Sequence, residues 1–277
     1  MNAFDEMLAD YDCRTTEGRI NALREVMQQV ALCGLAQAGF FERAAFYGGT
    51  CLRIFYGVER FSEDMDFSLL QEDRDFDFTP YFSSVIDLFA SFGQKVDISL
   101  KKKSKESAVQ SAFLKGETAQ FHLSLERGRL IKIKLEVDTS PPLAFSTENR
   151  LLLRPWSFYT RCFTPSCLFA GKMHALLYRA WGNRVKGRDW YDFEWYVRKR
   201  IPLDFRHFQE RAYQFESAGE GTLTPEHFRE LLREKIDSTD FTSAAEDVRP
   251  FLHHPEHIEL WSADYFRQVA DQMCLSD

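Results

Sequence analysis

The sequence predicts an α+β protein in which a mixed sheet with helices forms the first part and helices alone form the second. Apolar and charged side chains alternate without exception over residues 131–138, which is typical of a half-buried strand. From about residue 160 onward, helical patterns replace the strand patterns. We therefore predict two domains, residues 1–150 and residues 151–277, with the boundary in the segment 145–163.

In the first part, apolar residues recur at helical spacing over 18–38 and predict an amphipathic helix. A short strand at 44–47 is expected to run into the turn Gly48-Gly49, and Thr50 is expected to be the N-cap of the helix that follows. The remaining elements predicted here are a helix at 50–56, a strand at 65–70, a helix at 81–92 and strands at 95–100, 119–126 and 131–138.

The second part begins with Thr164-Pro165, which fits the N-cap and first residue of a helix. Gly182-Asn183 is expected to end that helix. Further helices are predicted at 188–200, 204–217, 225–236, 241–251 and 256–273.

The composition indicates a packed globular protein with an aromatic core, because 44% of the 277 residues are hydrophobic and 26 are phenylalanine. The net charge of −7 argues against a protein that coats nucleic acid, although it leaves room for a local basic groove. The six cysteines form no CxxC pair, which predicts a reduced, cytoplasmic protein. We expect no signal peptide and no membrane span, since no run of about 18 apolar residues occurs.

The motif Asp64-Met65-Asp66 lies in the predicted strand at 65–70 and its approach. Alternate strand residues point to the same face, so the two carboxylates should lie side by side. Their mutual repulsion is relieved by a divalent cation, and oxygen ligands suit Mg²⁺ or Mn²⁺. On its own this pattern is equally typical of a solvated strand face. The Gly-Gly turn upstream adds backbone N–H groups for a phosphate at a helix start, and the combination predicts nucleotidyl transfer.

A two-metal transferase requires a third carboxylate from a neighbouring strand. Glu136 and Asp138 both lie on the polar face of the strand 131–138. Either residue fills the role by pattern alone, and the alternative is that both only keep an exposed strand face soluble.

The helical part contains Lys172 beside apolar residues, where a lysine either snorkels to solvent or reaches a triphosphate. Residues 179–188 carry four basic groups and no acidic one, which makes them a candidate phosphate or RNA contact or a solvated loop. Asp189 and Asp192 are spaced i, i+3 and share a helix face. A lysine cluster at 101–105 is expected at a hairpin tip.

In order, these motifs resemble those of the AbiEii/AbiGii-type nucleotidyltransferase toxins, which belong to the DNA-polymerase-β-like nucleotidyltransferase superfamily. The resemblance covers about residues 40–200 and rests on Gly48-Gly49-Thr50, Leu52-Arg53, Arg60-x-Ser62-Glu63-Asp64-x-Asp66-Phe67, Lys134-Leu135-Glu136-Val137, Lys172-x-x-Ala175-Leu176 and Arg188-Asp189-x-Tyr191-Asp192. Two positions depart from the family pattern: the first motif is Gly-Gly-Thr where Gly-Ser is frequent, and Glu136 stands where Asp is common.

The resemblance implies a polymerase-β-like mixed sheet followed by a helical domain that completes the active site. It implies the toxin of a type IV toxin–antitoxin (abortive infection) system, paired with a winged-helix antitoxin. Such a toxin uses Mg²⁺ and an NTP and transfers the nucleotide to an RNA such as the 3′ end of tRNA.

By motif match, Asp64, Asp66, Lys172 and Asp189 are the implied catalytic residues. Asp64 and Asp66 with Glu136 or Asp138 are the implied metal ligands. The implied substrate contacts are Gly48, Gly49, Thr50, Arg53, Ser62, Lys134, Arg179 and Arg188.

Two other functions fit the same motifs. The acceptor could be a hydroxyl of a protein or a small molecule, or the fold could bind NTP without catalysis. Because Asp64, Asp66, Lys172 and Asp189 are present together, catalysis is the favoured interpretation.

Overall fold

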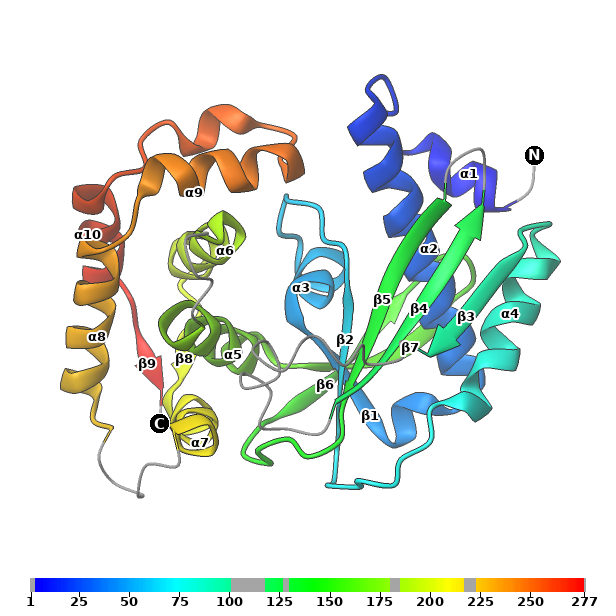
Figure 1. Ribbon diagram of the computed structural model, residues 1–277, viewed down its shortest axis with the longest axis horizontal. Coiled ribbons are helices and arrows are strands. Elements are labelled where there is room, and N and C mark those ends of the chain that lie inside the picture. The colour runs from blue at the N-terminus through cyan, green and yellow to red at the C-terminus, as the bar shows by residue number, and fades with distance from the viewer. Residues whose placement is uncertain (1–2, 101–117, 127–129, 180–184, 217–222, 277) are drawn as a thin grey trace, which may run out of the picture. The chain divides into compact units, whose positions relative to one another are not determined.

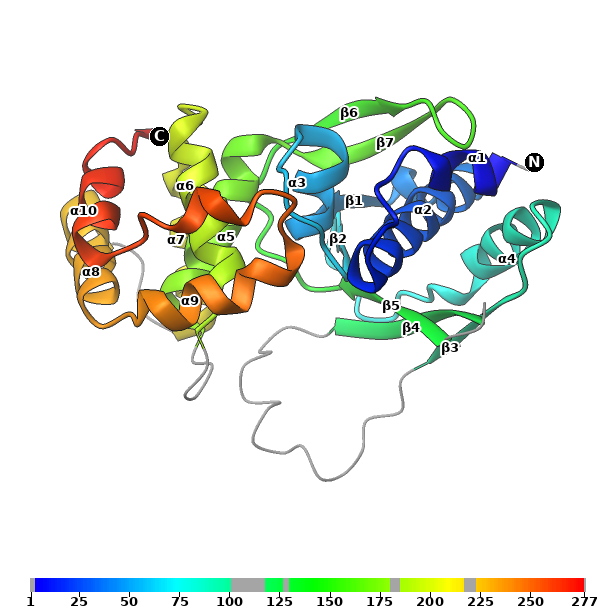
Figure 2. The ribbon, with the colours of Figure 1, turned by 90° about the horizontal axis from the view of Figure 1, so that it is seen from above.

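The structure is a computed structural model that describes residues 3–100, 118–126, 130–179, 185–216 and 223–276 (Figures 1 and 2). The chain divides into two compact units. Unit 1 comprises residues 1–57, 61–143 and 147–163, and unit 2 comprises residues 58–60, 144–146 and 164–277. Each unit is described by itself below.

Unit 1 contains a seven-stranded mixed sheet with the order β3-β4-β5-β2-β1-β7-β6, which confirms the predicted fold class. At its centre, β2 pairs with β1 in an antiparallel and with β5 in a parallel arrangement. The strands are β1 Ala44–Tyr47, β2 Met65–Leu69, β3 Val96–Leu100, β4 Thr118–Glu126, β5 Leu130–Asp138, β6 Thr147–Leu152 and β7 Phe158–Phe163.

The helices of unit 1 are α1 Ala3–Ala9, α2 Thr16–Gln37, α3 Gly48–Tyr56 and α4 Phe82–Ser91, with 3₁₀ turns at Phe40–Glu42 and Thr79–Tyr81. The predicted helix at 18–38 is confirmed as α2, which starts earlier because Thr15 caps it by accepting a hydrogen bond from the Gly18 amide at 3.0 Å. α2 packs against α4, β5 and β7, while α4 packs against β3 (Figure 2). The two helices cross closely at Gly34, where a Cβ atom would lie 2.8 Å from the Val85 Cα.

Aromatic rings fill the core beside this layer, as the composition predicted. The Phe40 ring centroid lies 5.1 Å from that of Phe67, 4.9 Å from that of Phe78 and 5.1 Å from that of Tyr81. The alternation over 131–138 is also confirmed in β5, where Ile131, Ile133, Leu135 and Val137 are buried. Burial of this apolar face is what fixes the strand to the core.

The segment 145–163 was predicted only as a domain boundary, yet it contains the antiparallel hairpin β6–β7 at the edge of the sheet. Leu151, Leu153 and Tyr159 are exposed, whereas Cys162 and Phe163 of β7 are buried. The edge strand β6 has no buried residue, so it lacks the alternation by which a half-buried strand is recognised in sequence.

Unit 2 is helical, with a short parallel pairing of β8 Leu203–Asp204 and β9 Leu275–Ser276 that the sequence did not indicate. Its helices are α5 Pro165–Tyr178, α6 Gly187–Arg198, α7 Phe205–Glu216, α8 Pro225–Asp237, α9 Phe241–Val248 and α10 Ala263–Asp271 (Figure 1). α5 contacts α6 and α7, and α6 contacts α9 and α10.

The prediction of one helix over 256–273 is wrong. A 3₁₀ turn at Pro255–Ile258 comes first, and α10 begins only after Ser262, whose side chain accepts a hydrogen bond from the Tyr265 amide at 3.2 Å. α9 likewise ends at Val248 and continues as a 3₁₀ turn. The predicted helix stop at 182–183 and the lysine cluster at 101–105 lie outside the described residues. Of the helices that the structure describes, none is long and apolar enough to cross a membrane.

Candidate active site

The turn after β1 brings a carboxylate onto the backbone at the start of α3. Gly48 has φ = +79°, a left-handed conformation that side chains with a Cβ atom disfavour. A Cβ atom there would lie 2.3 Å from Asp66 Oδ2. The β1–β2 register explains this proximity, because Tyr47 pairs with Asp66 across the two strands. Glycine at position 48 is therefore required both by the turn and by the carboxylate above it.

The start of α3 differs from the prediction that Thr50 is its N-cap. The helix begins at Gly48 with Tyr47 in the cap position, so Thr50 lies within the first turn. The Thr50 side chain is fully buried, and its hydroxyl donates a hydrogen bond to the Asp64 carbonyl. The first turn of any helix presents N–H groups that have no partner within the helix and that favour anions. Gly48, Gly49 and Thr50 supply these groups here.

The two carboxylates of the Asp-x-Asp motif lie at the start of β2. Asp64 directly precedes the strand and is exposed, and Asp66 is half-buried. Met65 and Phe67, between and beyond them, are fully buried on the opposite face. This is the alternation that the sequence predicted.

The parallel pairing of β2 with β5 separates the two candidates for the third carboxylate. Glu136 is the register partner of Asp66, whereas Asp138 is the partner of Ser68. Neighbouring strands lie about 4.8 Å apart and register partners point to the same face, so Glu136 stands directly beside Asp66. The Glu136 carboxylate also forms an ion pair with Lys134 at 2.7 Å. Gly48, Asp66, Glu136 and Lys134 thus gather at one place on the sheet.

These residues suit a divalent cation by their chemistry, since carboxylate oxygens are the ligands that Mg²⁺ and Mn²⁺ prefer. Within the described ranges, no three His, Cys, Asp or Glu side chains are grouped closely enough to hold a metal ion. The structure therefore places these carboxylates on one face of the neighbouring strands β2 and β5, but they do not form a complete coordination sphere.

Arg53 and Ser62 occupy positions that connect α3 and the β2 approach to α2. The Arg53 Nε donates to Glu25 Oε2 at 2.8 Å, and its guanidinium lies 4.8 Å from the centre of the Phe61 ring. The Ser62 carbonyl accepts a hydrogen bond from Gln28 Nε2 at 3.1 Å.

Glu25 and Gln28 were missed by reasoning from the sequence. With Asn21 they follow a helical i, i+4, i+7 spacing, and all three are buried in α2. Three polar residues at that spacing inside a predicted helix were the available signal.

Unit 2 contains a buried ionic cluster formed by Arg60, Lys172, Asp189 and Asp192. Lys172 on α5 places its ammonium 2.8 Å from a carboxylate oxygen of Asp189 and 2.8 Å from one of Asp192, both on α6. Arg60 binds Asp192 through two hydrogen bonds, from Nε at 2.6 Å and from Nη2 at 2.5 Å. Arg60 and Asp192 are 1% and 0% exposed. Two cations and two anions make the cluster neutral.

Opposite charges keep Lys172 and Asp192 ionised. Burial by itself lowers the pKa of Lys172, but the carboxylates of Asp189 and Asp192 outweigh burial and raise that pKa. Burial by itself raises the pKa of Asp192, but Arg60 and Lys172 outweigh burial and lower it. Lys172 and Asp189 were predicted from sequence, whereas the role of Arg60 was not.

The basic residues at 179–188 are only partly described. Arg179 follows the last residue of α5 and is exposed, and Lys186 precedes α6. The Arg188 guanidinium lies 4.1 Å from the centre of the Phe251 ring, a cation–π contact. Arg184 lies outside the described residues.

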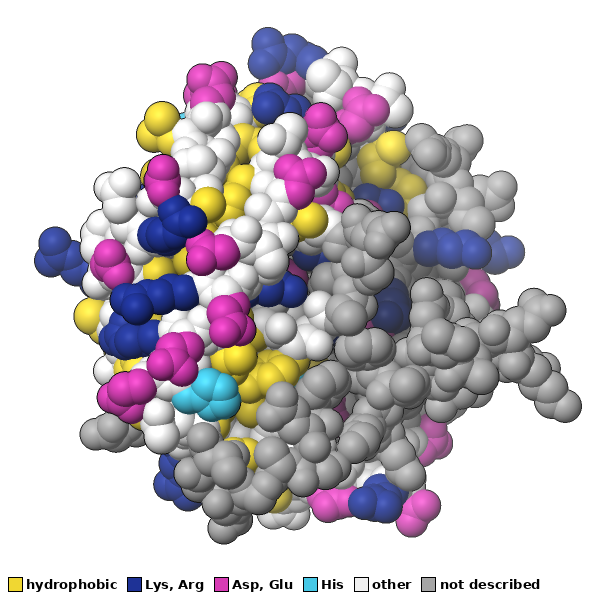
Figure 3. Space-filling view, turned by 60° about the vertical axis from the view of Figure 1, so that its left-hand side comes forward, with side chains coloured by type: hydrophobic (Ala, Val, Ile, Leu, Met, Phe, Trp, Pro, Cys, Tyr) yellow, Lys and Arg dark blue, Asp and Glu magenta, His cyan; other side chains and the backbone are white. Residues whose placement is uncertain are grey.

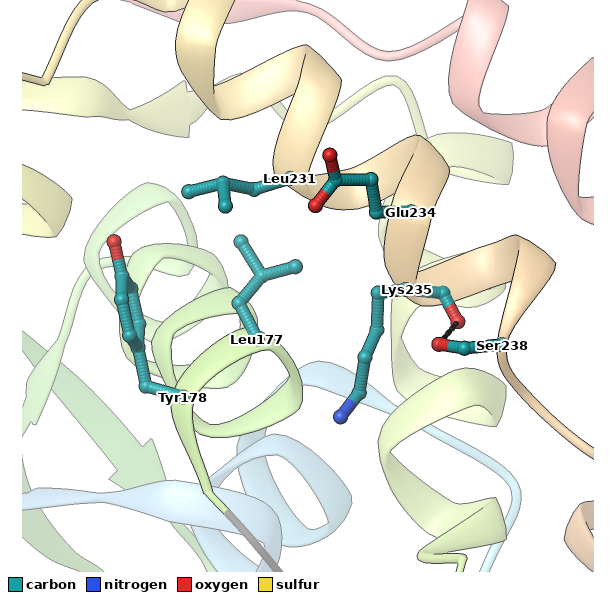
Figure 4. Close-up of a pocket in the computed structure, with 6 residues that line it drawn as sticks. All are labelled: Leu177, Tyr178, Leu231, Glu234, Lys235 and Ser238. Carbon is teal, nitrogen blue, oxygen red and sulfur yellow. Dashed lines mark hydrogen bonds between the residues drawn. The ribbon is translucent and has the colours of Figure 1, made fainter.

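A separate groove of about 330 Å³ lies in unit 2, lined by residues of α5 and α8 (Figure 4). Its lining is Leu177, Tyr178, Leu231, Glu234, Lys235 and Ser238, which includes no predicted site residue. On the face shown in Figure 3, acidic and basic side chains are intermingled rather than gathered by sign.

Comparisons with known proteins identify the family. The family model described as "Nucleotidyl transferase AbiEii toxin, Type IV TA system" matches residues 30–271. The nucleotidyltransferase toxin MenT4 of Mycobacterium tuberculosis is similar in structure, with a TM-score of 0.54 at 17% identity over 96% of this chain and 92% of that one. JHP933 of Helicobacter pylori is also similar, with a TM-score of 0.51 at 15% identity over 91% of this chain and 88% of that one. A comparison with curated proteins gave no match.

The two structural likenesses concern the fold, and the family match covers most of the chain. The chain therefore belongs to the family of AbiEii nucleotidyl transferase toxins of type IV toxin–antitoxin systems, and it is a nucleotidyltransferase.

Proposed function

We propose that this toxin transfers a nucleoside monophosphate from an NTP to an RNA acceptor, such as the 3′ end of tRNA, with Mg²⁺ or Mn²⁺ held by Asp64 and Asp66. The observation that carries the proposal is the position of Asp66, which lies against the Gly48 backbone and pairs in register with Glu136. Here two carboxylates, which bind a metal ion, lie beside the N-terminus of a helix, whose N–H groups bind phosphate.

Glu136 is the third carboxylate in this proposal. Its register position beside Asp66 favours it over Asp138, which lies next to Ser68. Lys134 supports the choice, because its ion pair with Glu136 at 2.7 Å holds that side chain on the polar face of β5.

In the proposed reaction, the acceptor hydroxyl attacks the α-phosphate of the NTP and pyrophosphate leaves. Asp64, Asp66 and Glu136 would hold Mg²⁺ or Mn²⁺, which would supply charge neutralisation of the triphosphate and a lowered pKa of the acceptor hydroxyl. The N–H groups of Gly48 and Gly49 bind phosphate oxygens, which the start of α3 favours.

Lys172 is the proposed cation for the triphosphate. Its ammonium has three donors, two of which point to Asp189 and Asp192. This arrangement orients the third N–H, and it keeps the group charged because the two carboxylates raise its pKa. Asp189 then acts by orienting Lys172.

RNA is the proposed acceptor class, with Arg179 and Arg188 as backbone contacts. Arg188 would contact the RNA backbone while its guanidinium stays stacked on the Phe251 ring. Family membership also implies a cognate antitoxin, which we propose is a winged-helix protein.

The test is transfer of label from each α-³²P-NTP to total tRNA with Mg²⁺, comparing wild type with Asp66→Asn. We expect labelled tRNA from wild type and loss of at least roughly 100-fold of the label in the variant. Label in a protein band instead of RNA would show that the acceptor is a protein. NTP binding without any transfer would overturn the proposed RNA reaction.

A further inference from the structure

The segment that leads into β2 is held by side chains from two helices. Gln28 of α2 donates through Nε2 to the carbonyls of Ser62 and Glu63, each at 3.1 Å. The Thr50 hydroxyl of α3 donates to the carbonyl of Asp64. Three consecutive backbone carbonyls therefore accept hydrogen bonds from side chains directly before the carboxylate strand.

The contact made by Gln28 is rigid. The side chain is only 1% exposed, and a primary amide has two N–H donors, which match the two carbonyls. The same helix contacts this segment a second time, because Arg24 forms an ion pair with Glu63 at 3.0 Å. The backbone from which Asp64 projects is thus fixed to α2.

We infer that Gln28 is a positioning residue, which sets Asp64 and Asp66 by holding the segment that precedes them. The inference rests on the proposed function of these two carboxylates. Gln28 lies just outside residues 30–271, which match the family model. Mutation of groups that orient metal-binding side chains typically lowers metal affinity or activity by roughly 10- to 100-fold.

The test compares Gln28→Met with Gln29→Met. Methionine keeps the length and volume of glutamine but donates no hydrogen bond. Gln29 is the next residue of α2 and is half-buried, and its amide donates to the Tyr11 hydroxyl at 3.1 Å instead. The two variants therefore each remove one glutamine amide from the same helix, and only Gln28→Met removes the hydrogen bonds to the carbonyls of Ser62 and Glu63.

For both variants, label transfer yields kcat and KM for NTP, and titration with Mn²⁺ followed by electron paramagnetic resonance yields the dissociation constant of the metal ion without turnover. For Gln28→Met we expect kcat to fall roughly 10- to 100-fold and the metal dissociation constant to rise several-fold, with KM for NTP within about twofold. For Gln29→Met we expect all three values within about twofold of wild type. A general loss of folding would not produce this division between the metal dissociation constant and KM.

Equal kinetics of Gln28→Met and Gln29→Met, with an active wild type and an inactive Asp66→Asn, would overturn this inference and leave the proposed function intact. An inactive wild type would overturn both. If Gln28→Met does not fold, Gln28→Asn keeps a polar amide but shortens the side chain by one methylene, which moves the amide away from the Ser62 and Glu63 carbonyls. An unchanged affinity for the metal ion in that variant would overturn the inference.

Discussion

Replacement of Arg60 by methionine tests the buried ionic cluster most severely. Arg60 is 1% exposed and makes two short hydrogen bonds to Asp192, which is fully buried. Removing one partner of a buried ion pair costs about 3–5 kcal/mol, because the other charge stays buried. Asp192 keeps one contact with Lys172 at 2.8 Å, so we expect a loss at the lower end of that range. Urea unfolding followed by tryptophan fluorescence measures the loss.

The matched control is Arg267→Met. The Arg267 guanidinium donates to Asp237 at 2.7 Å and also to Asp264, but its side chain is 46% exposed, so we expect a much smaller loss of stability than for Arg60→Met. The double variant Arg60→Met with Asp192→Asn should regain part of the loss, because it removes the buried charge together with its partner. Equal losses in the free energy of unfolding for Arg60→Met and Arg267→Met would contradict a special contribution of the buried cluster.

Two further predictions follow from the geometry. Gly48→Ala should lower the free energy of unfolding by about 1–2 kcal/mol because of the left-handed backbone. It should also reduce label transfer by the protein that remains folded, because the added Cβ atom displaces the Asp66 carboxylate. Unfolding and label transfer measured on the same sample separate the two effects. Burial, assisted by Arg211, lowers the pKa of His174 to about 2 and that of His207 to about 3. Since both folded values lie below the unfolded value of about 6.5, their stabilisation is complete above that pH and is lost as the pH falls. We expect the free energy of unfolding to drop by roughly 2–3 kcal/mol between pH 6 and pH 5, and His174→Gln to reduce that slope by about half.

Local patterns made much of unit 1 predictable from sequence. β5 was predictable because the apolar residues from Ile131 to Val137 are buried and the charged residues between them lie on the opposite face. The helix α2 was predictable from apolar residues at helical spacing, although the polar residues Asn21, Glu25 and Gln28 are buried in it as well. In α10 the cap signal of Ser262 was present in the sequence, but the longer apolar pattern obscured it.

Contacts between distant residues could not be predicted in this way. The pairing of Asp66 with Glu136 depends on strand register, which spacing within one strand does not determine. Arg60 and Asp192 are 132 residues apart, so no periodicity connects them. The spacing of Asn21, Glu25 and Gln28 singles out Gln28, but its partners could not be predicted, because they are backbone carbonyls, which every residue has.

The central claim is that nucleotidyl transfer depends on the carboxylates that the β2–β5 register brings together. Label transfer from α-³²P-NTP to tRNA, measured for Glu136→Gln and Asp138→Asn, tests it most directly, since both residues lie on the same face of β5. We expect a loss of at least roughly 100-fold for Glu136→Gln and a change within about threefold for Asp138→Asn. Full activity of Glu136→Gln, or a greater loss in Asp138→Asn, would contradict it.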